Sequence, residues 1–134
     1  MSKTMKAARL YGKKDLRVEE VPVPEINENE VLLKVKSTAV CGTDIRMYKN
    51  GVDHINENKP LILGHEIAGT IEKIGSNVSG YRAGKDAVVA PNMGCGVCDM
   101  CVSGNTQLCP DYEALGINLD GGFAEFVRIP AKAV

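Results

Sequence analysis

The sequence predicts a mainly β, barrel-like domain. Several short segments of alternating or β-branched residues lie between turn-forming residues, and helical periodicity is sparse. The length of 134 residues is typical of one domain. A chain of this size buries about two-thirds of its unfolded surface. We therefore expect one compact core.

The clearest strand signal lies at residues 31–40. Val31, Leu33 and Val35 would share a buried face, while Lys34 and Lys36 would share an exposed one. This alternation predicts a half-buried strand. Weaker signals, each bounded by Gly, Pro, Asn or Asp, predict further strands at 6–10, 16–21, 67–74, 87–90 and 123–129.

One short helix is predicted, from Thr43 or Asp44 to about Lys49. Either of the first two side chains would accept backbone amide hydrogens, and Gly51 would end the helix. Segment 52–59 is predicted to be a polar loop. Tight turns, in which glycine adopts a positive φ at little steric cost, are expected at 75–77 and 120–122.

Composition argues against several classes of partner. Sixteen Lys and Arg against 17 Asp and Glu give a formal net charge of -1, and no stretch concentrates either sign, so nucleic acid is not expected as a partner. No export signal or membrane span is expected, because the longest apolar run is 87–90. Five cysteines without such a signal favour metal binding in a reducing compartment, and the cytoplasm is the expected location.

Four cysteines form the strongest motif, a Cys-x2-Cys-x2-Cys-x7-Cys series. Structural zinc takes four tetrahedral thiolates at about 2.3 Å and leaves no position for a substrate. This site is therefore expected to stabilise the fold. An iron–sulfur cluster is the main alternative, because Pro110 follows the last cysteine, but the seven-residue gap disfavours it. Free or redox-active thiols are a third possibility for Cys95, Cys98, Cys101 and Cys109.

A second group of candidate metal ligands comprises Cys41, His65 and Glu66. A thiolate and an imidazole are ligand types of an open catalytic zinc site, which needs a third protein ligand and one position for substrate. Glu66 or a residue after Val134 would be the third ligand. Without a metal, Cys41 would be a small buried thiol, His65 a structural histidine and Glu66 a surface carboxylate.

Two other motifs are missing from this chain. Gly69 stands where a metalloprotease His-Glu-x-x-His motif has its second histidine, which disfavours a protease. No Gly-x-Gly-x-x-Gly fingerprint follows a strand, so no dinucleotide-binding domain is expected within residues 1–134.

Nearly the whole chain resembles the zinc-dependent medium-chain alcohol and polyol dehydrogenase family. The most specific motifs are Gly64-His65-Glu66-x-x-Gly69, continuing through 75–78, and the glycine-rich cysteine series at 94–109. The resemblance implies a GroES-like β domain over 1–134, with a short helix and a zinc lobe at about 91–112. It also implies a Rossmann domain outside this chain that would bind NAD or NADP.

The resemblance also assigns roles to individual residues. Cys41 and His65 would bind catalytic zinc, while Glu66 would lie beside the metal and enter or leave its coordination shell. Thr43 would pass a proton. Asp44 would accept a hydrogen bond from the ring nitrogen of His65 that faces away from zinc.

One position departs from many relatives. Arg46 stands where they have a histidine that extends the proton relay, and a guanidinium does not readily exchange protons. His54 lies in the predicted polar loop and is expected to be exposed rather than to replace that histidine.

The implied activity is that of the sorbitol, butanediol and threonine dehydrogenase branch, to which Cys-Gly-Thr-Asp at 41–44 is similar. A secondary alcohol, polyol or vicinal diol would be oxidised to a ketone, with hydride transfer to NAD or NADP. The full-length enzyme would be a homo-oligomer, and this chain alone would be inactive. Two other classes stay open: a non-catalytic zinc-stabilised β module and an iron–sulfur electron-transfer module.

Overall fold

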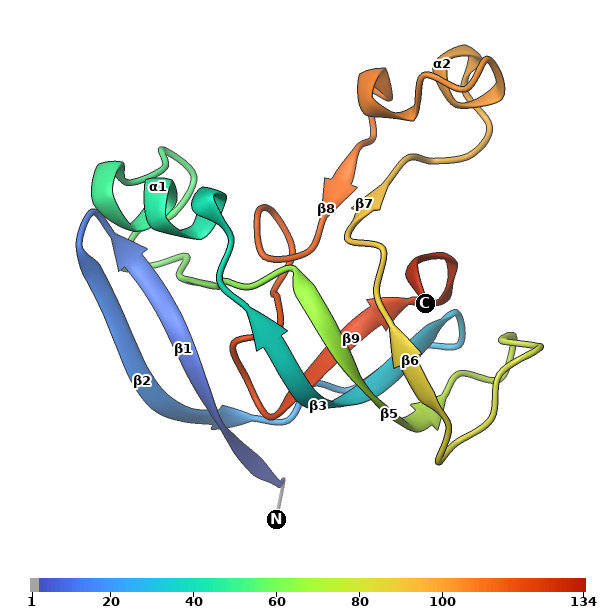
Figure 1. The fold of residues 1–134 in the computed structure, drawn as a ribbon, viewed down its shortest axis with the longest axis horizontal. Coiled ribbons are helices and arrows are strands. Elements are labelled where there is room, and N and C mark those ends of the chain that lie inside the picture. Colours follow the sequence, from blue (N-terminus) through green and yellow to red (C-terminus); the bar gives the residue numbers. More distant parts are fainter. Residues whose placement is uncertain (1–2) are drawn as a thin grey trace.

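The computed structural model, which describes residues 3–134, consists of curved antiparallel sheets, one helix of two turns and a projecting lobe (Figure 1). A long hairpin pairs β1 (Thr4–Gly12) with β2 (Asp15–Pro22), and β4 (Leu61–Ile62) pairs with the other edge of β1. The predicted mainly β fold is confirmed.

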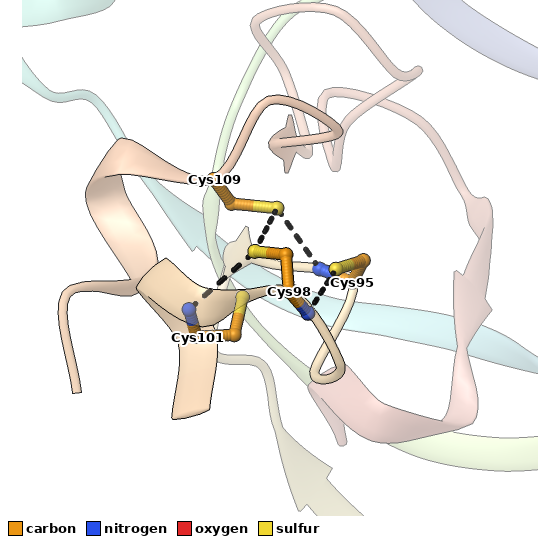
Figure 2. Close-up of side chains that lie close together, drawn as sticks. All are labelled: Cys95, Cys98, Cys101 and Cys109. Atoms are coloured by element: carbon orange, nitrogen blue, oxygen red, sulfur yellow. Dashed lines mark hydrogen bonds between the residues drawn. The ribbon is translucent and has the colours of Figure 1, made fainter. Parts of the chain in front are cut away.

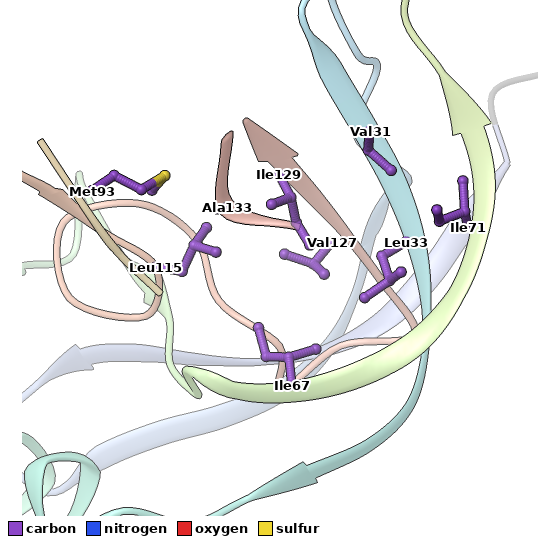
Figure 3. Packing of buried hydrophobic residues seen from close by; sticks show 9 residues of the cluster. All are labelled: Val31, Leu33, Ile67, Ile71, Met93, Leu115, Val127, Ile129 and Ala133. Atoms are coloured by element: carbon purple, nitrogen blue, oxygen red, sulfur yellow. The ribbon is translucent and has the colours of Figure 1, made fainter. Parts of the chain in front are cut away.

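A four-stranded sheet forms the centre of the domain. Its order is β6 (Asp86–Val88), β5 (Glu66–Ile74), β3 (Glu30–Ala39) and β9 (Phe126–Pro130), with every neighbouring pair antiparallel. Figure 3 shows the main apolar core gathered against these strands. The core residues are Val31, Leu33, Ile67, Ile71, Met93, Leu115, Val127, Ile129 and Ala133.

Strand β3 is buried differently from the simple alternation predicted for 31–40. Leu32 is only 4 % exposed, because it packs in a second cluster with Met5, Ile62 and Phe126 on the other side of the sheet. The second half of β3 is more open, and Ser37 and Ala39 are exposed. A register shift between Val35 and Ser37 interrupts the alternation there.

Helix α1 (Gly42–Asn50) begins earlier than predicted. Cys41 is its N-cap residue, and the Asp44 carboxylate accepts a hydrogen bond from the backbone N–H of Cys41 at 2.9 Å. The capping carboxylate thus lies inside the first turn, as in a capping box. Gly51 ends the helix with φ of 79°, as predicted.

The projecting lobe lies between two short strands. β7 (Asn92–Met93) pairs with β8 (Glu113–Ala114), and between them run α2 (Asp99–Val102) and the 3-10 turn η1 (Thr106–Leu108). Lys132, in the 3-10 turn η2 (Ala131–Ala133), donates a hydrogen bond to the carbonyl of Gly94 at 2.9 Å. This bond ties the base of the lobe to the end of the chain.

The reason given for glycine in the two predicted turns was wrong. Gly75, Gly121 and Gly122 do not adopt a positive φ. A Cβ on Gly75 would lie 2.4 Å from the carbonyl oxygen of Glu28, and one on Gly121 would lie 2.0 Å from that of Gly64. Close backbone approach, rather than turn geometry, therefore requires glycine at these positions.

The helices of the domain are short. Across residues 3–134, none of them combines the length and the apolar character needed to cross a bilayer.

Candidate metal centres

The sulfur atoms of the four lobe cysteines converge on one point (Figure 2). All four lie within 4.8 Å of one another, and Sγ of Cys98 is 3.8 Å from Sγ of Cys109. A tetrahedral zinc ion with bonds of about 2.3 Å requires sulfur–sulfur distances of about 3.8 Å. The donor set therefore fits a closed, four-thiolate zinc site.

Hydrogen bonds from backbone amides lower the pKa of a lobe thiol and so favour its thiolate form, which binds metal cations. Hydrogen bonds from the backbone N–H groups of Val97 and Cys98 lower the pKa of Cys95 to about 6. At Cys101, a backbone hydrogen bond at Gly96 lowers the pKa, but desolvation and the neighbouring thiols outweigh it and raise the pKa to about 11. A cation bound among the sulfurs would favour their thiolate forms.

The local backbone is shaped to bring these sulfurs together. A Cβ on Gly94 would lie 2.5 Å from Sγ of Cys101, so only glycine leaves room for that thiol. Cys98 caps α2 by accepting a hydrogen bond from the backbone N–H of Cys101 at 3.5 Å. The turn of α2 thus places two of the four sulfurs side by side.

The second predicted group also comes together. Ligand atoms of Cys41, His65 and Glu66 lie within 4.8 Å of one another, although the three residues come from the N-cap of α1 and the start of β5. His65 is 9 % exposed, Cys41 is half-buried and Glu66 is exposed. One side of the group is therefore buried in the domain, and Glu66 lies on its open side.

Asp44 connects the two segments that carry these residues. Its carboxylate is 3 % exposed and accepts hydrogen bonds from the backbone N–H groups of Cys41 at 2.9 Å and Gly64 at 3.3 Å. Its Oδ1 atom lies 3.6 Å from Nδ1 of His65. That ring nitrogen is buried and has no hydrogen-bond partner within the described chain, so Asp44 is the polar group that faces it.

Three residues that bear on the proton relay, Thr43, Arg46 and His54, lie on or shortly after α1. Thr43 is half-buried, and Arg46 is exposed. His54 is exposed, as predicted, and its Nε2 atom lies 2.8 Å from the carbonyl oxygen of Ile117.

Sequence reasoning missed the glycines around the backbone that precedes His65. Gly116 and Gly121 both approach Gly64, whereas the sequence suggested only a turn at 120–122 and gave no prediction for Gly116. The only signal was the glycine itself, which does not reveal the distant carbonyl it accommodates.

Comparison with known proteins identifies the family. The profile of the alcohol dehydrogenase GroES-like domain matches residues 27–134. The chain belongs to this family. Its relatives include sorbitol dehydrogenase of Bacillus subtilis strain 168, which is 39 % identical over 127 residues, or 93 % of this chain and 36 % of the relative. L-threonine 3-dehydrogenase of Xanthomonas oryzae pv. oryzae strain MAFF 311018 is 40 % identical over 89 % of this chain and 35 % of its own length.

Solved structures of alcohol dehydrogenases share the fold of this chain. The cobalt- and zinc-bound thermostable enzyme of Pyrobaculum aerophilum superposes with a TM-score of 0.87 at 33 % identity, covering 98 % of this chain and 40 % of that one. An alcohol dehydrogenase of Escherichia coli CFT073 complexed with NADH gives a TM-score of 0.86 at 33 % identity, covering 97 % and 37 %. This GroES-like chain thus spans little more than a third of the length of the relatives it matches.

Proposed function

We propose that this chain is the catalytic domain of a zinc-dependent alcohol or polyol dehydrogenase that uses NAD or NADP. The observation that carries the proposal is the convergence of Cys41, His65 and Glu66, in a chain that also holds a separate four-cysteine site. One group is closed by four sulfurs, whereas the other mixes ligand types and has an exposed side. That difference is the one expected between a structural and a catalytic zinc site.

Each residue of the second group would have a distinct task. Cys41 and His65 would hold zinc, which supplies a Lewis acid for the substrate oxygen. Asp44 would keep the His65 ring oriented, since it faces the Nδ1 atom and leaves Nε2 for the ion. Glu66, at the exposed side, would enter or leave the coordination shell.

The proton would move through Thr43. Thr43 is a half-buried residue two positions after Cys41, and its hydroxyl would take a proton from the substrate alcohol and pass one to water. Arg46 would end the relay at this point, because a guanidinium holds its proton at neutral pH. Hydride would be accepted by the nicotinamide of NAD or NADP in the complete enzyme.

A polyol, a vicinal diol or another secondary alcohol is the substrate class that the relatives support, since they include a sorbitol and a threonine dehydrogenase. The proposed domain covers residues 1–134, with the zinc lobe at about 91–112. We also propose that the complete enzyme is a cytoplasmic homo-oligomer.

A paired substitution of the two histidines tests the function. In the whole protein, we expect reduction of NAD or NADP in the presence of sorbitol, butanediol or threonine. His65→Gln should abolish this activity, whereas His54→Gln should retain it, because His54 is exposed and bonds only to a loop carbonyl. Absorbance of the reduced nicotinamide measures both. A non-catalytic zinc module would show no turnover with any of these alcohols.

A further inference from the structure

Two glycines from a distant segment enclose the backbone that carries His65. We propose that Gly116 and Gly121, together with Gly64, form a glycine clamp that positions His65 for metal binding. The clamp residues contact neither metal nor substrate. They act through the peptide backbone of Gly64, and the assignment rests on the proposed function of His65 as a zinc ligand.

Gly64 is the centre of the clamp. Its φ of +89° lies in the left-handed region, which strains any residue with a side chain. A Cβ at this position would also lie 2.6 Å from Cδ1 of the Phe123 ring. Both the backbone conformation and the nearby aromatic ring therefore require glycine immediately before His65.

The carbonyl oxygen of Gly64 is surrounded by the other two glycines. A Cβ on Gly121 would lie 2.0 Å from this oxygen, and one on Gly116 would lie 2.6 Å from it. The backbone N–H of Gly122 donates a hydrogen bond to the same oxygen at 2.8 Å. Only glycine at positions 116 and 121 therefore leaves room for this carbonyl oxygen.

Further hydrogen bonds hold the backbone of the two residues that precede Gly64. The backbone N–H groups of Gly121 and Phe123 donate to the carbonyls of Ile62 and Leu63 at 2.7 and 2.9 Å. The backbone N–H of Gly64 donates a hydrogen bond to the Asp44 carboxylate, which also accepts one from the backbone N–H of Cys41. The clamp and Asp44 together fix the His65 backbone relative to Cys41.

A methyl group in the clamp would disturb this arrangement. Gly121→Ala would place the new Cβ 2.0 Å from the Gly64 carbonyl oxygen, so these two backbone segments must separate by about 1 Å next to His65. Metal–ligand distances in working sites stay within about 0.2 Å of their ideal values. The clamp therefore matters for metal binding beyond its effect on stability.

The test compares Gly121→Ala with Gly75→Ala in the whole protein. Both positions lack a positive φ and face a backbone carbonyl, at 2.0 Å and 2.4 Å respectively, but Gly75 lies beside Glu28 rather than His65. The affinity for a second ion, cobalt, is measured after the lobe has been loaded with zinc. We expect Gly121→Ala to weaken it by about 10- to 100-fold, the range for groups that orient a metal ligand, and Gly75→Ala to leave it unchanged.

A second matched pair decides the question if Gly121→Ala does not fold. Gly116 has φ of +67° and meets the Gly64 carbonyl, whereas Gly80 has φ of +84° and open space around it. Gly116→Ala and Gly80→Ala therefore impose similar backbone strain, but only the first should weaken binding of the second ion. Unfolding midpoints of all variants separate stability from affinity.

A second readout does not need the metal. The chain has two histidines, so the His65 imidazole is readily assigned in a long-range proton–nitrogen NMR spectrum of the metal-free protein. Its signals should shift in the clamp variants and stay fixed in the controls. The clamp would be overturned if the clamp variants bound cobalt as tightly as the wild type and their His65 imidazole signals did not shift. If the wild type binds no second ion while these shifts occur, the proposed function fails and the metal-binding role of the clamp fails with it, whereas the effect of the clamp on the position of His65 is supported.

Discussion

The Oδ1 atom of Asp44 lies 3.6 Å from Nδ1 of His65. The same buried carboxylate bonds to the backbone N–H groups of Cys41 and Gly64. Asp44→Asn keeps the shape of this side chain but removes its charge, so the His65 ring loses its anionic partner. We expect affinity for the second metal ion to fall by about 10- to 100-fold in a cobalt titration of the whole protein, with the lobe zinc retained.

Asp53→Asn is the control for this substitution, because Asp53 is an exposed residue of the loop after α1. It removes the same charge from the protein without touching the group around His65. Equal losses of affinity in the two variants would attribute the effect to net charge and contradict the positioning role of Asp44.

Removal of one lobe sulfur should release the structural zinc. Sγ of Cys98 lies 3.8 Å from Sγ of Cys109, and Cys98 also caps α2. Cys98→Ser removes the sulfur ligand but keeps the helix start, because serine is a favoured N-cap residue. Because structural zinc contributes directly to folding, we expect loss of one zinc per chain and a lower unfolding midpoint. Elemental analysis and thermal unfolding measure the two effects. Val97→Ala, at an exposed lobe residue, should keep both the zinc and the midpoint.

The 134-residue chain by itself should hold its two metal ions with unequal strength. Four sulfurs close the lobe site, whereas the group at Cys41 has one thiolate, one imidazole and an exposed carboxylate. We therefore expect one zinc to survive dialysis against a mild chelator and the second to be lost. Elemental analysis that found two retained zinc ions would contradict this. Brown colour with bound iron would instead support the iron–sulfur alternative.

The sequence predicted the long strands because each of them carries a regular pattern of side chains. β1 and β2 pair in register over most of their length, and the first half of β1 alternates between exposed and buried residues, whereas Val18 of β2 is 74 % exposed. The two-residue strand β4 has no such pattern, and its pairing with β1 depends on contacts far along the chain. Burial of Leu32 was also missed, because alternation does not reveal that a sheet is covered on both sides.

The candidate ligands were predictable for a chemical reason. Cysteine and histidine are rare in this chain, and the spacing of the lobe cysteines restricts what they can bind. The glycines that support His65 were not predictable in this way. Gly121 was interpreted as a turn residue, whereas its small size accommodates the carbonyl of Gly64, which lies far earlier in the chain.

The central sheet should depend on its core residues and tolerate change at exposed positions of its edge strand β6. Leu33 of β3 is 0 % exposed within the main core, whereas Val88 of β6 is 72 % exposed on the same sheet. Leu33→Ala should lower the free energy of unfolding by about 2–5 kcal/mol, because it removes buried contacts and leaves a cavity. Val88→Ala should change it by less than about 0.5 kcal/mol. Urea unfolding of both variants measures the difference, and similar losses would mean that the core is not centred on β3.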